Sequence, residues 1–394
     1  MKRIVIVFFI IPFIVSALNL QAFAGKFVSE SMAQIVAYSN VLLIFIGIVL
    51  SIKNSRKIPY TIKLWFWFFA IYYSFGLIGN FLHYPDAPYV KTLVPIIYFI
   101  GFAFFLSYDK YLKLFSKTVA YTFLVSNLLL IYFERINFSM DVGGIYEYSL
   151  SRAGGVYGDA NNAAVVCLLS FIFIHNVFDP INLLQKVLKT LGLVISLYAL
   201  FLTFSNTGFI ALLIVLGLTY HKFFNPKRII LLILFVPISG FLLIQTALNS
   251  PNLDRVQKNR IENVINVLTL RTDKVTLSER DILLKNMLNY VYENPFIGNG
   301  VYFSTDIRGH NTVIGVWADA GIFTFLFFLF VLFQYYKNAV LAQTKIRYFT
   351  LSILVVLSIF MLTLQTIINQ PYLIVLFAYL SYTMVKDHLV EQVY

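Results

Sequence analysis

The chain has 394 residues, of which 59% are hydrophobic and only 12% are charged, and its mean hydropathy is +0.80. No water-soluble fold could bury that much apolar surface, so the composition excludes a soluble globular protein and indicates a membrane protein. The net charge of +12 does not indicate a nucleic-acid partner, because most basic residues lie in short loops between apolar segments, where they set membrane orientation or bind anionic substrates.

About twelve apolar segments follow one another along the chain, and each predicts a transmembrane helix. We therefore expect an all-α polytopic membrane protein that forms a single integral membrane domain over residues 1–394. Two neighbouring segments are short for full crossings, so the "TFSNTG" between them is expected to turn inside or near the outer interface, where protein buries it or where it lines a water-filled cavity. The predicted segments are 4–24, 33–52, 62–82, 92–107, 118–133, 161–178, 190–205, 207–220, 229–248, 312–333, 348–367 and 371–385.

The distribution of Lys and Arg predicts that both chain ends lie in the cytoplasm. In that orientation the cytoplasmic segments hold 18 of the 30 basic residues, and the short outer loops hold four. The other eight lie in one long outer loop, 249–311, between the ninth and tenth predicted helices, and long loops are largely exempt from the positive-inside rule. The first segment also fits a signal peptide, but its long apolar run favours an uncleaved helix.

The first polar outer loop is "EYSLSRAGGVYGDANNAAVV", residues 147–166. Here Arg152 stands beside three glycines, which free the backbone for a tight path that could present N–H groups to an anion. Asp159 is expected to cap the following helix, near whose start Asn161 lies. A capped loop around a structural arginine explains the same residues, so both interpretations stay open.

The long outer loop ends in "TLSERDILLKNMLNYVYENPFIGNGV", residues 276–301. Ser278 and Asp281 form a capping box, and the apolar spacing that follows predicts a short amphipathic helix that ends before Pro295. Arg280 falls in its first turn, where a cation opposes the helix dipole at a cost of about 0.3–1 kcal/mol. Either its acidic neighbours neutralise it, or it binds a phosphate or diphosphate together with the free N–H groups of the helix.

The tenth segment begins in "DIRGHNTVIGVWADAG", residues 306–321. His310 at its start is either a polar interfacial residue or a functional group. Asp319 would lie about 13 Å further along the helix, on the opposite face, which excludes a direct pair of these two residues. A carboxylate at that depth costs about 2.5–3.5 kcal/mol and needs a cavity or a partner. The histidines and the single Cys167 form no metal-ligand spacing, so we expect neither a metal site nor a disulfide.

These motifs resemble a known family. The spacing of Arg280, Pro295, Gly298 and Gly300, followed by "HN" and "DAG", resembles the C-terminal signature of the bacterial O-antigen polymerase and O-antigen ligase superfamily. The upstream "SRAGGVYGDANNAA" resembles the R-x-x-G-x-x-x-x-x-N loop of that family, and the resemblance covers roughly residues 120–335.

The chain departs from the family pattern at one position. Members often carry Ser/Thr-Arg where this chain has "SNTG", so Asn206 cannot supply the charge of that arginine. Arg308, which lies two residues before His310, is the candidate to replace it.

The resemblance implies a C-type glycosyltransferase in the bacterial inner membrane, with one large periplasmic loop that contains short helices and an active site that faces the periplasm. Its substrate would be an oligosaccharide on undecaprenyl diphosphate, and it would need neither cofactor nor metal, because guanidinium groups stabilise the departing diphosphate and an imidazole accepts the proton. By resemblance, His310 and Arg280 would be catalytic, Arg152, Arg280 and Arg308 would bind the diphosphate, and Asn161, Asn311 and Asp319 would support the site.

Three functions follow as hypotheses. We favour a polymerase that transfers the growing glycan from one undecaprenyl diphosphate to the non-reducing sugar of the next lipid-linked unit, with a chain-length regulator protein as a further partner. The first alternative is a ligase that transfers the glycan to the lipid A core. The second is a polysaccharide or lipid transporter, for which the broken helices around "TFSNTG" and the intramembrane Asp319 would be suited.

Overall fold

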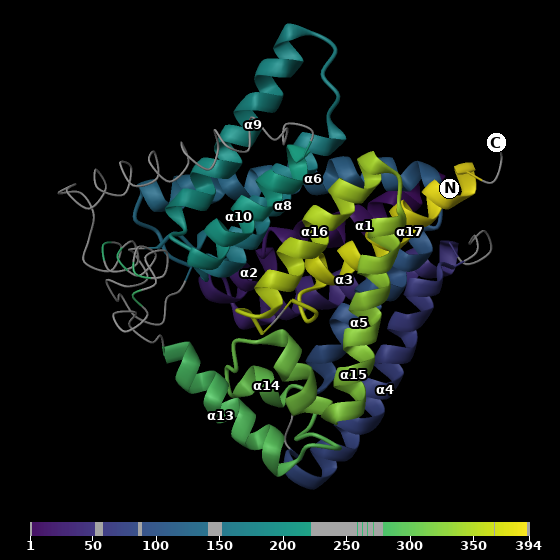
Figure 1. The fold of residues 1–394 in the computed structure, drawn as a ribbon, viewed down its shortest axis with the longest axis vertical. Coiled ribbons are helices and arrows are strands. Elements are labelled where there is room, and N and C mark those ends of the chain that lie inside the picture. Colours follow the sequence, from purple (N-terminus) through teal and green to yellow (C-terminus); the bar gives the residue numbers. More distant parts are fainter. Residues whose placement is uncertain are drawn as a thin grey trace.

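The computed structural model describes residues 2–51, 58–85, 89–140, 152–221, 279–365 and 367–391, together with the isolated positions 258, 262, 266 and 271. This part of the chain is helical throughout, with loops between the helices (Figure 1). Its elements are α1 (Lys2–Ala17), α2 (Leu20–Phe27), α3 (Glu30–Ser51), α4 (Tyr60–His83), α5 (Tyr89–Leu106), α6 (Asp109–Arg135), η2 (Gly155–Tyr157), α8 (Ala160–Val177), α9 (Leu183–Leu202), α10 (Asn206–Thr219), α13 (Glu279–Glu293), α14 (Phe303–Asp306), α15 (Thr312–Leu341), α16 (Thr344–Met361) and α17 (Pro371–Glu391).

The all-α, multi-pass membrane architecture expected from the composition is confirmed. Seven of the described helices are long and apolar enough to cross a membrane, and an eighth span results if the bent pair α1 and α2 is one crossing. Three shorter apolar helices lie within α5, α10 and α17. Every predicted segment contains a helix except 229–248, which lies outside the described residues. By length and composition the described helices offer seven or eight spans, and the predicted count of twelve is not shown.

Three predicted segments have a different shape in the structure. The first segment is not straight, because α1 and α2 meet at a bend of 58° at Asn19, whose φ is +52°. The predicted segment 348–367 is too long, since α16 ends at Met361 and the chain continues as a loop to α17. The predicted segment 312–333 is interrupted, because the backbone of α15 leaves helical geometry at Ala320 and Gly321.

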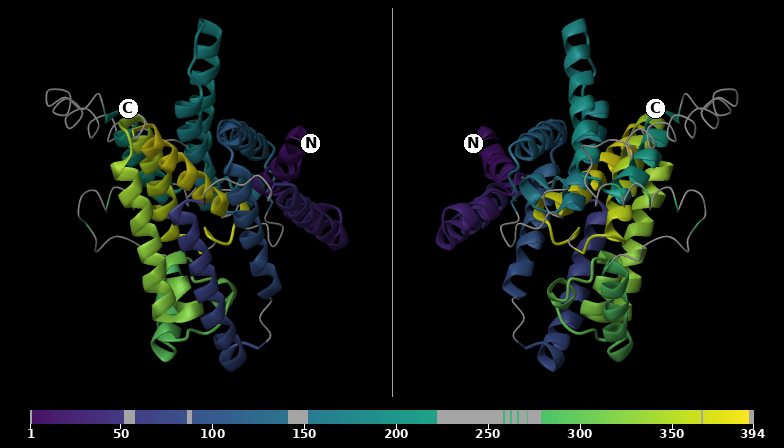
Figure 2. Two further views of the ribbon diagram at one scale, coloured as in Figure 1. Left: turned by 90° about the vertical axis from the view of Figure 1, so that its right-hand side faces the viewer. Right: turned by 90° about the vertical axis from the view of Figure 1, so that its left-hand side faces the viewer.

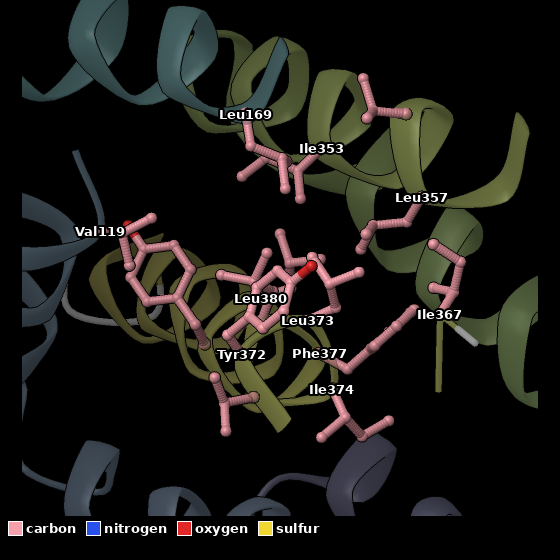
Figure 3. Packing of buried hydrophobic residues seen from close by; sticks show 14 of the residues in the cluster. Val119, Leu169, Ile353, Leu357, Ile367, Tyr372, Leu373, Ile374, Phe377 and Leu380 are labelled. Carbon is pink, nitrogen blue, oxygen red and sulfur yellow. The ribbon is translucent and has the colours of Figure 1, made fainter. Parts of the chain in front are cut away.

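The hydrophobic core surrounds α17. This helix is apolar on all sides and buried along most of its length, as expected for a helix that other helices enclose. Figure 3 shows its residues Leu373, Phe377 and Leu380 packed among side chains of the surrounding helices, including Leu169 of α8 and Ile353 of α16. Apolar side chains on the outside of the bundle, such as those of α9, are exposed in the structure and suit contact with lipid.

One end of the bundle carries a small helical layer, here called the cap, which consists of α13, the turn 294–302, α14 and the first turns of α15. Figures 1 and 2 show α4 and α15 running side by side to this end, where α13 and α14 lie against them. Met287 and Val291 of α13 are fully buried and pack against Ala318, Trp317 and Ile314 of α15. The predicted short amphipathic helix before Pro295 is therefore confirmed, and its apolar face rests on α15.

Candidate functional site

The Arg152 loop precedes α8 and is held from inside the bundle. Arg152 is only 7% exposed; its Nε donates to the carbonyl oxygen of Thr203 at 3.2 Å, and its Nη2 donates to Oδ1 of Asn161 at 3.3 Å. The carboxyl group of Asp159 caps α8 by accepting from the backbone N–H groups of Asn161 and Asn162. The predicted N-cap is thus confirmed, and the hydrogen bonds of Asp159 fix Asn161 where it can reach the guanidinium of Arg152.

The "SNTG" turn between α9 and α10 completes this cluster. Ser205 is fully buried; its hydroxyl donates to Oδ1 of Asn161 at 2.8 Å and caps α10 by accepting from the backbone N–H of Gly208. Thr203 is also fully buried. Of the two environments expected for this turn, the structure shows burial in protein, and Asn161 connects the turn to Arg152.

A small pocket opens beside Arg152. It is lined by Arg152 and three glycines (Gly154, Gly155 and Gly158), by Phe133 and Glu134 at the end of α6, and by residues 137–140 after that helix. Gly155 and Gly158 have φ values of +53° and +70°, and a Cβ atom on Gly154 would clash with the carbonyl group of Gly158. Because a side chain would not fit this path, the glycines let the backbone approach whatever occupies the pocket.

In the cap, the P-x-x-G-x-G turn packs against the break in α15. The carbonyl oxygen of Pro295 accepts from the backbone N–H of Ile322 and from the indole of Trp317, while Gly300 donates its N–H to the carbonyl oxygen of Asp319. Gly321 has a φ of +77°, and a Cβ atom there would clash with the carbonyl oxygen of Phe296. The P-x-x-G-x-G turn and the break in α15 are therefore held together by these hydrogen bonds and by the close approach at Gly321.

Asp319 lies directly before this break and is 2% exposed. Its Oδ1 accepts from the backbone N–H of Ser304 at 2.6 Å, and its Oδ2 accepts from the hydroxyl groups of Ser304 at 3.0 Å and Tyr72 at 2.7 Å. These contacts supply the partner that the sequence could not name. The break in α15 also corrects the predicted geometry, because Asp319 ends a short helical segment and does not lie midway along a straight span.

His310 precedes α15 with a left-handed backbone. Its φ is +50°, and Tyr302 and Arg308 in the same stretch have φ values of +76° and +53°. Such values are uncommon for residues other than glycine and tend to gather at functional sites. The backbone N–H of His310 donates to Oε1 of Gln365 at 3.3 Å, so the position of this histidine depends on the loop after α16.

That loop, residues 362–370, links the cap to the Arg152 loop, and we call it the linking loop. On the cap side, the N–H of Thr312 donates to the carbonyl oxygen of Leu364, and Nδ2 of Asn369 donates to the hydroxyl of Thr305 at 3.5 Å. On the other side, Nε2 of Gln370 donates to Oδ1 of Asn162 at 2.9 Å. The linking loop therefore forms hydrogen bonds with residues near both predicted site regions, the cap and the Arg152 loop.

The remaining predicted site residues have different positions. Arg308 is exposed, and Asn311 caps α15 through its side-chain oxygen. Arg280 lies in the first turn of α13, as predicted, but its side chain lies outside the described residues. Within the described ranges, no group of three or more His, Cys, Asp or Glu side chains lies together as a metal site would require.

Sequence reasoning missed Tyr72, Ser304 and the linking loop. Gln365 is 7% exposed, and its Nε2 is buried without a hydrogen-bond partner among the described residues. The detectable signal was "QTIINQ", a polar stretch between two strongly apolar segments. Tyr72 gave no signal, because it lies 247 residues from Asp319 within an apolar helix.

The fold and these polar loops define a multi-pass membrane protein with a buried polar centre at one end of its bundle. Residues 191–329 match the family model Wzy_C, described as O-Antigen ligase. The match covers about a third of the chain, and over these residues the chain is similar to that family. The matched range includes the "SNTG" turn, the cap and the start of α15, whereas the Arg152 loop precedes it.

The other two comparisons are less informative. No curated protein matches the chain. One similar solved structure is a chain with 17% sequence identity and a TM-score of 0.44, with coverage of 83% of this chain and 97% of that chain. Its title is "Structural coordination of polymerization and crosslinking by a peptidoglycan synthase complex".

Proposed function

We propose that this protein is a metal-independent glycosyltransferase of the bacterial inner membrane that polymerises lipid-linked surface-polysaccharide repeat units at the periplasmic face. The growing glycan is transferred from undecaprenyl diphosphate to the non-reducing sugar of the next undecaprenyl-diphosphate-linked unit. The Wzy_C match supports the class of reaction. The observation that carries the assignment to particular residues is the linking loop, which contacts both the His310 backbone and Asn162 beside the Arg152 cluster.

In the proposed reaction, His310 is the general base. A hydroxyl oxygen of the acceptor sugar attacks the anomeric carbon of the donor, the bond from that carbon to the diphosphate oxygen breaks, and the imidazole takes the hydroxyl proton. The diphosphate leaves with its lipid, and its developing negative charge is stabilised by guanidinium groups. Arg280 and Arg152 carry that role in this proposal, with Arg308 as the exposed cation nearest to His310 in the sequence.

A reconstituted assay tests the proposal. The purified protein is mixed with lipid-linked repeat units, and the release of undecaprenyl diphosphate is measured together with the length of the glycan product. We expect release and chain growth with the natural sequence and neither with His310→Ala. If the natural protein released no undecaprenyl diphosphate while moving the lipid-linked unit across vesicles, a transporter would replace the enzyme.

The family description also names a ligase, so the acceptor needs its own test. A strain that lacks the gene separates the two enzymes by the lipopolysaccharide it makes. Loss of a polymerase leaves single repeat units on the lipid A core, whereas loss of a ligase leaves the core without any repeat unit. We expect single repeat units.

A further inference from the structure

A second pocket lies at the same end of the bundle, between the α1–α2 bend, α3, α5 and α17. Its cavity volume is about 180 Å³, below the range of about 300–1,000 Å³ typical of sites for whole small molecules, so it suits a small group such as a single sugar ring. We call it the amide pocket; its polar and aromatic lining includes Asn19, Asn40, Asn162, Gln370, Tyr98 and Tyr372.

The polar part of the lining is uncharged. Among the described lining residues, the polar groups are amides and hydroxyls, and neither a cation nor a carboxylate is present. A polar cavity inside a lipid-embedded bundle has to be filled by water or by a ligand that makes hydrogen bonds, because unpaired polar groups are costly there. The absence of cations from this lining makes it unsuited to a diphosphate, whereas the pocket beside Arg152 contains a guanidinium group together with the carboxylate of Glu134.

Two lining groups point to a ligand rather than to internal structure. The hydroxyl of Tyr372 is buried without a hydrogen-bond partner among the described residues, and the residue is 4% exposed. Asn40 is 6% exposed, and none of the described hydrogen bonds engages its amide. Burying such groups costs free energy unless something in the cavity pairs with them.

The aromatic part of the lining adds a stacking surface. The rings of Tyr157 and Tyr372 lie with their centroids 5.6 Å apart, and Tyr98 lines the same pocket. Burial raises the pKa of the Tyr157 hydroxyl, which stays protonated and donates to the carbonyl oxygen of Ala17. Hydroxyl and amide groups beside apolar ring faces match a sugar, whose hydroxyl groups need hydrogen-bond partners and whose C–H faces need apolar contact.

The amide pocket adjoins the proposed transfer site. Asn162 and Gln370, which are joined by a hydrogen bond of 2.9 Å, belong to its wall. The residues next to them in the sequence do not line the pocket and contact the proposed transfer site instead: Asn161 contacts Arg152, and Asn369 contacts Thr305 in the cap. A ligand in this pocket would therefore lie directly behind the linking loop that positions His310.

We propose that the amide pocket binds an uncharged sugar residue of the acceptor glycan, an assignment that rests on the proposed function. The acceptor would be held by neutral hydrogen bonds in the amide pocket, while the donor diphosphate is held by arginines elsewhere. This division gives the two substrates, which share the same lipid and diphosphate, different sites of recognition.

Direct binding tests the pocket without requiring catalysis. The probe is the repeat-unit oligosaccharide released from the strain's own polysaccharide, free of lipid and phosphate, and binding to purified protein in detergent is measured by saturation-transfer NMR and titration. Ala37→Trp fills the pocket and should abolish binding. Ile35→Trp is the matched control, at a 59% exposed position on the same helix and outside the pocket lining, and should leave binding unchanged.

A second variant avoids added volume. Asn40→Leu keeps the size of the side chain and removes its hydrogen bonds, so we expect about a tenfold loss of affinity, the factor that one lost buried hydrogen bond produces. His310→Ala should bind the probe normally. Binding that survives both Ala37→Trp and Asn40→Leu, or no binding by the natural protein, would overturn the assignment. The reconstituted transfer assay would still report separately whether the protein is a transferase.

Discussion

Asp319 and Arg152 are both buried ionisable residues, but the cap and the Arg152 loop engage them differently. The carboxyl group of Asp319 accepts three hydrogen bonds, two from Ser304 and one from Tyr72, and so joins α15 to α14 and to α4. The guanidinium of Arg152 bonds to Thr203 and Asn161 and also lines a pocket with three glycines. Asp319 connects three helices through hydrogen bonds, whereas Arg152 forms part of the wall of a pocket.

The comparison changes how the polar residues of this chain are interpreted. Insertion cost alone makes any intramembrane carboxylate a candidate for function. We expect an architectural role for Asp319 instead, because its carboxyl oxygens bind Ser304 and Tyr72 and its carbonyl oxygen accepts from Gly300 of the glycine turn. His310, two residues before the same short helical segment, has a left-handed backbone and donates its N–H to Gln365, and residues with such backbones tend to gather at functional sites.

The largest effect is expected at His310. His310→Ala should abolish polymer formation, because the proposed general base is lost, while the amount of protein in the membrane stays normal. Polysaccharide gel ladders and immunoblots of membranes measure the two quantities. A normal ladder would show that the strained backbone at His310 serves only to shape the cap.

Substitutions of Arg280 test whether this residue binds the donor diphosphate. If the guanidinium binds a diphosphate through two parallel hydrogen bonds, Arg280→Lys should lose nearly as much activity as Arg280→Ala, because an ammonium cannot reproduce that geometry. Lys285→Ala, at an exposed position on the same helix, is the matched control and should retain activity. Full activity of Arg280→Lys would leave this arginine a structural role.

Asp319→Ala should act on stability. Without the carboxyl group, the N–H and hydroxyl of Ser304 and the hydroxyl of Tyr72 are buried without an acceptor, at a cost of about 1–3 kcal/mol for each. We expect a lower unfolding temperature and less protein in the membrane, with activity reduced in proportion to the folded fraction. Normal stability together with lost turnover would instead make Asp319 a catalytic group and reverse the comparison.

Local sequence signals predicted much of this end of the molecule. The Asp159 N-cap and the helix before Pro295 follow from residues within a few positions of one another, and the "SNTG" turn follows from the short segments on either side of it; the structure shows all three. Local capping and turn chemistry suffice for such features, because their hydrogen bonds close over three or four residues.

The parts that sequence reasoning missed depend on long-range contacts. At the break in α15, the carbonyl oxygen of Phe296 comes so close to Gly321 that no Cβ atom would fit there, and Asp319 finds one of its hydrogen-bond donors, Tyr72, on a helix far upstream. A glycine after an alanine in an apolar run looks like an ordinary helical position. Residues 362–367 of the linking loop were predicted to belong to a helix, because apolar residues continue past the end of α16 at Met361.

Tyr72→Phe gives the smallest expected effect and the most direct test of the Asp319 contacts. The change removes one donor to Asp319 and keeps the ring, which packs against Phe68 and Tyr73, so we expect a loss of about 1 kcal/mol in the free energy of unfolding with activity unchanged. Tyr73→Phe, whose hydroxyl donates to Thr92, is the control on the neighbouring residue.

The decisive measurement is a double-mutant cycle between Tyr72→Phe and Asp319→Ala, followed by thermal unfolding. If Tyr72 stabilises the fold through Asp319, its substitution should cost much less once the carboxyl group is gone, whereas Tyr73→Phe should cost the same in both backgrounds. Equal costs for Tyr72→Phe with and without Asp319 would mean that the hydroxyl and the carboxyl group stabilise the cap independently. The break in α15 would then depend on the packing of the glycine turn alone.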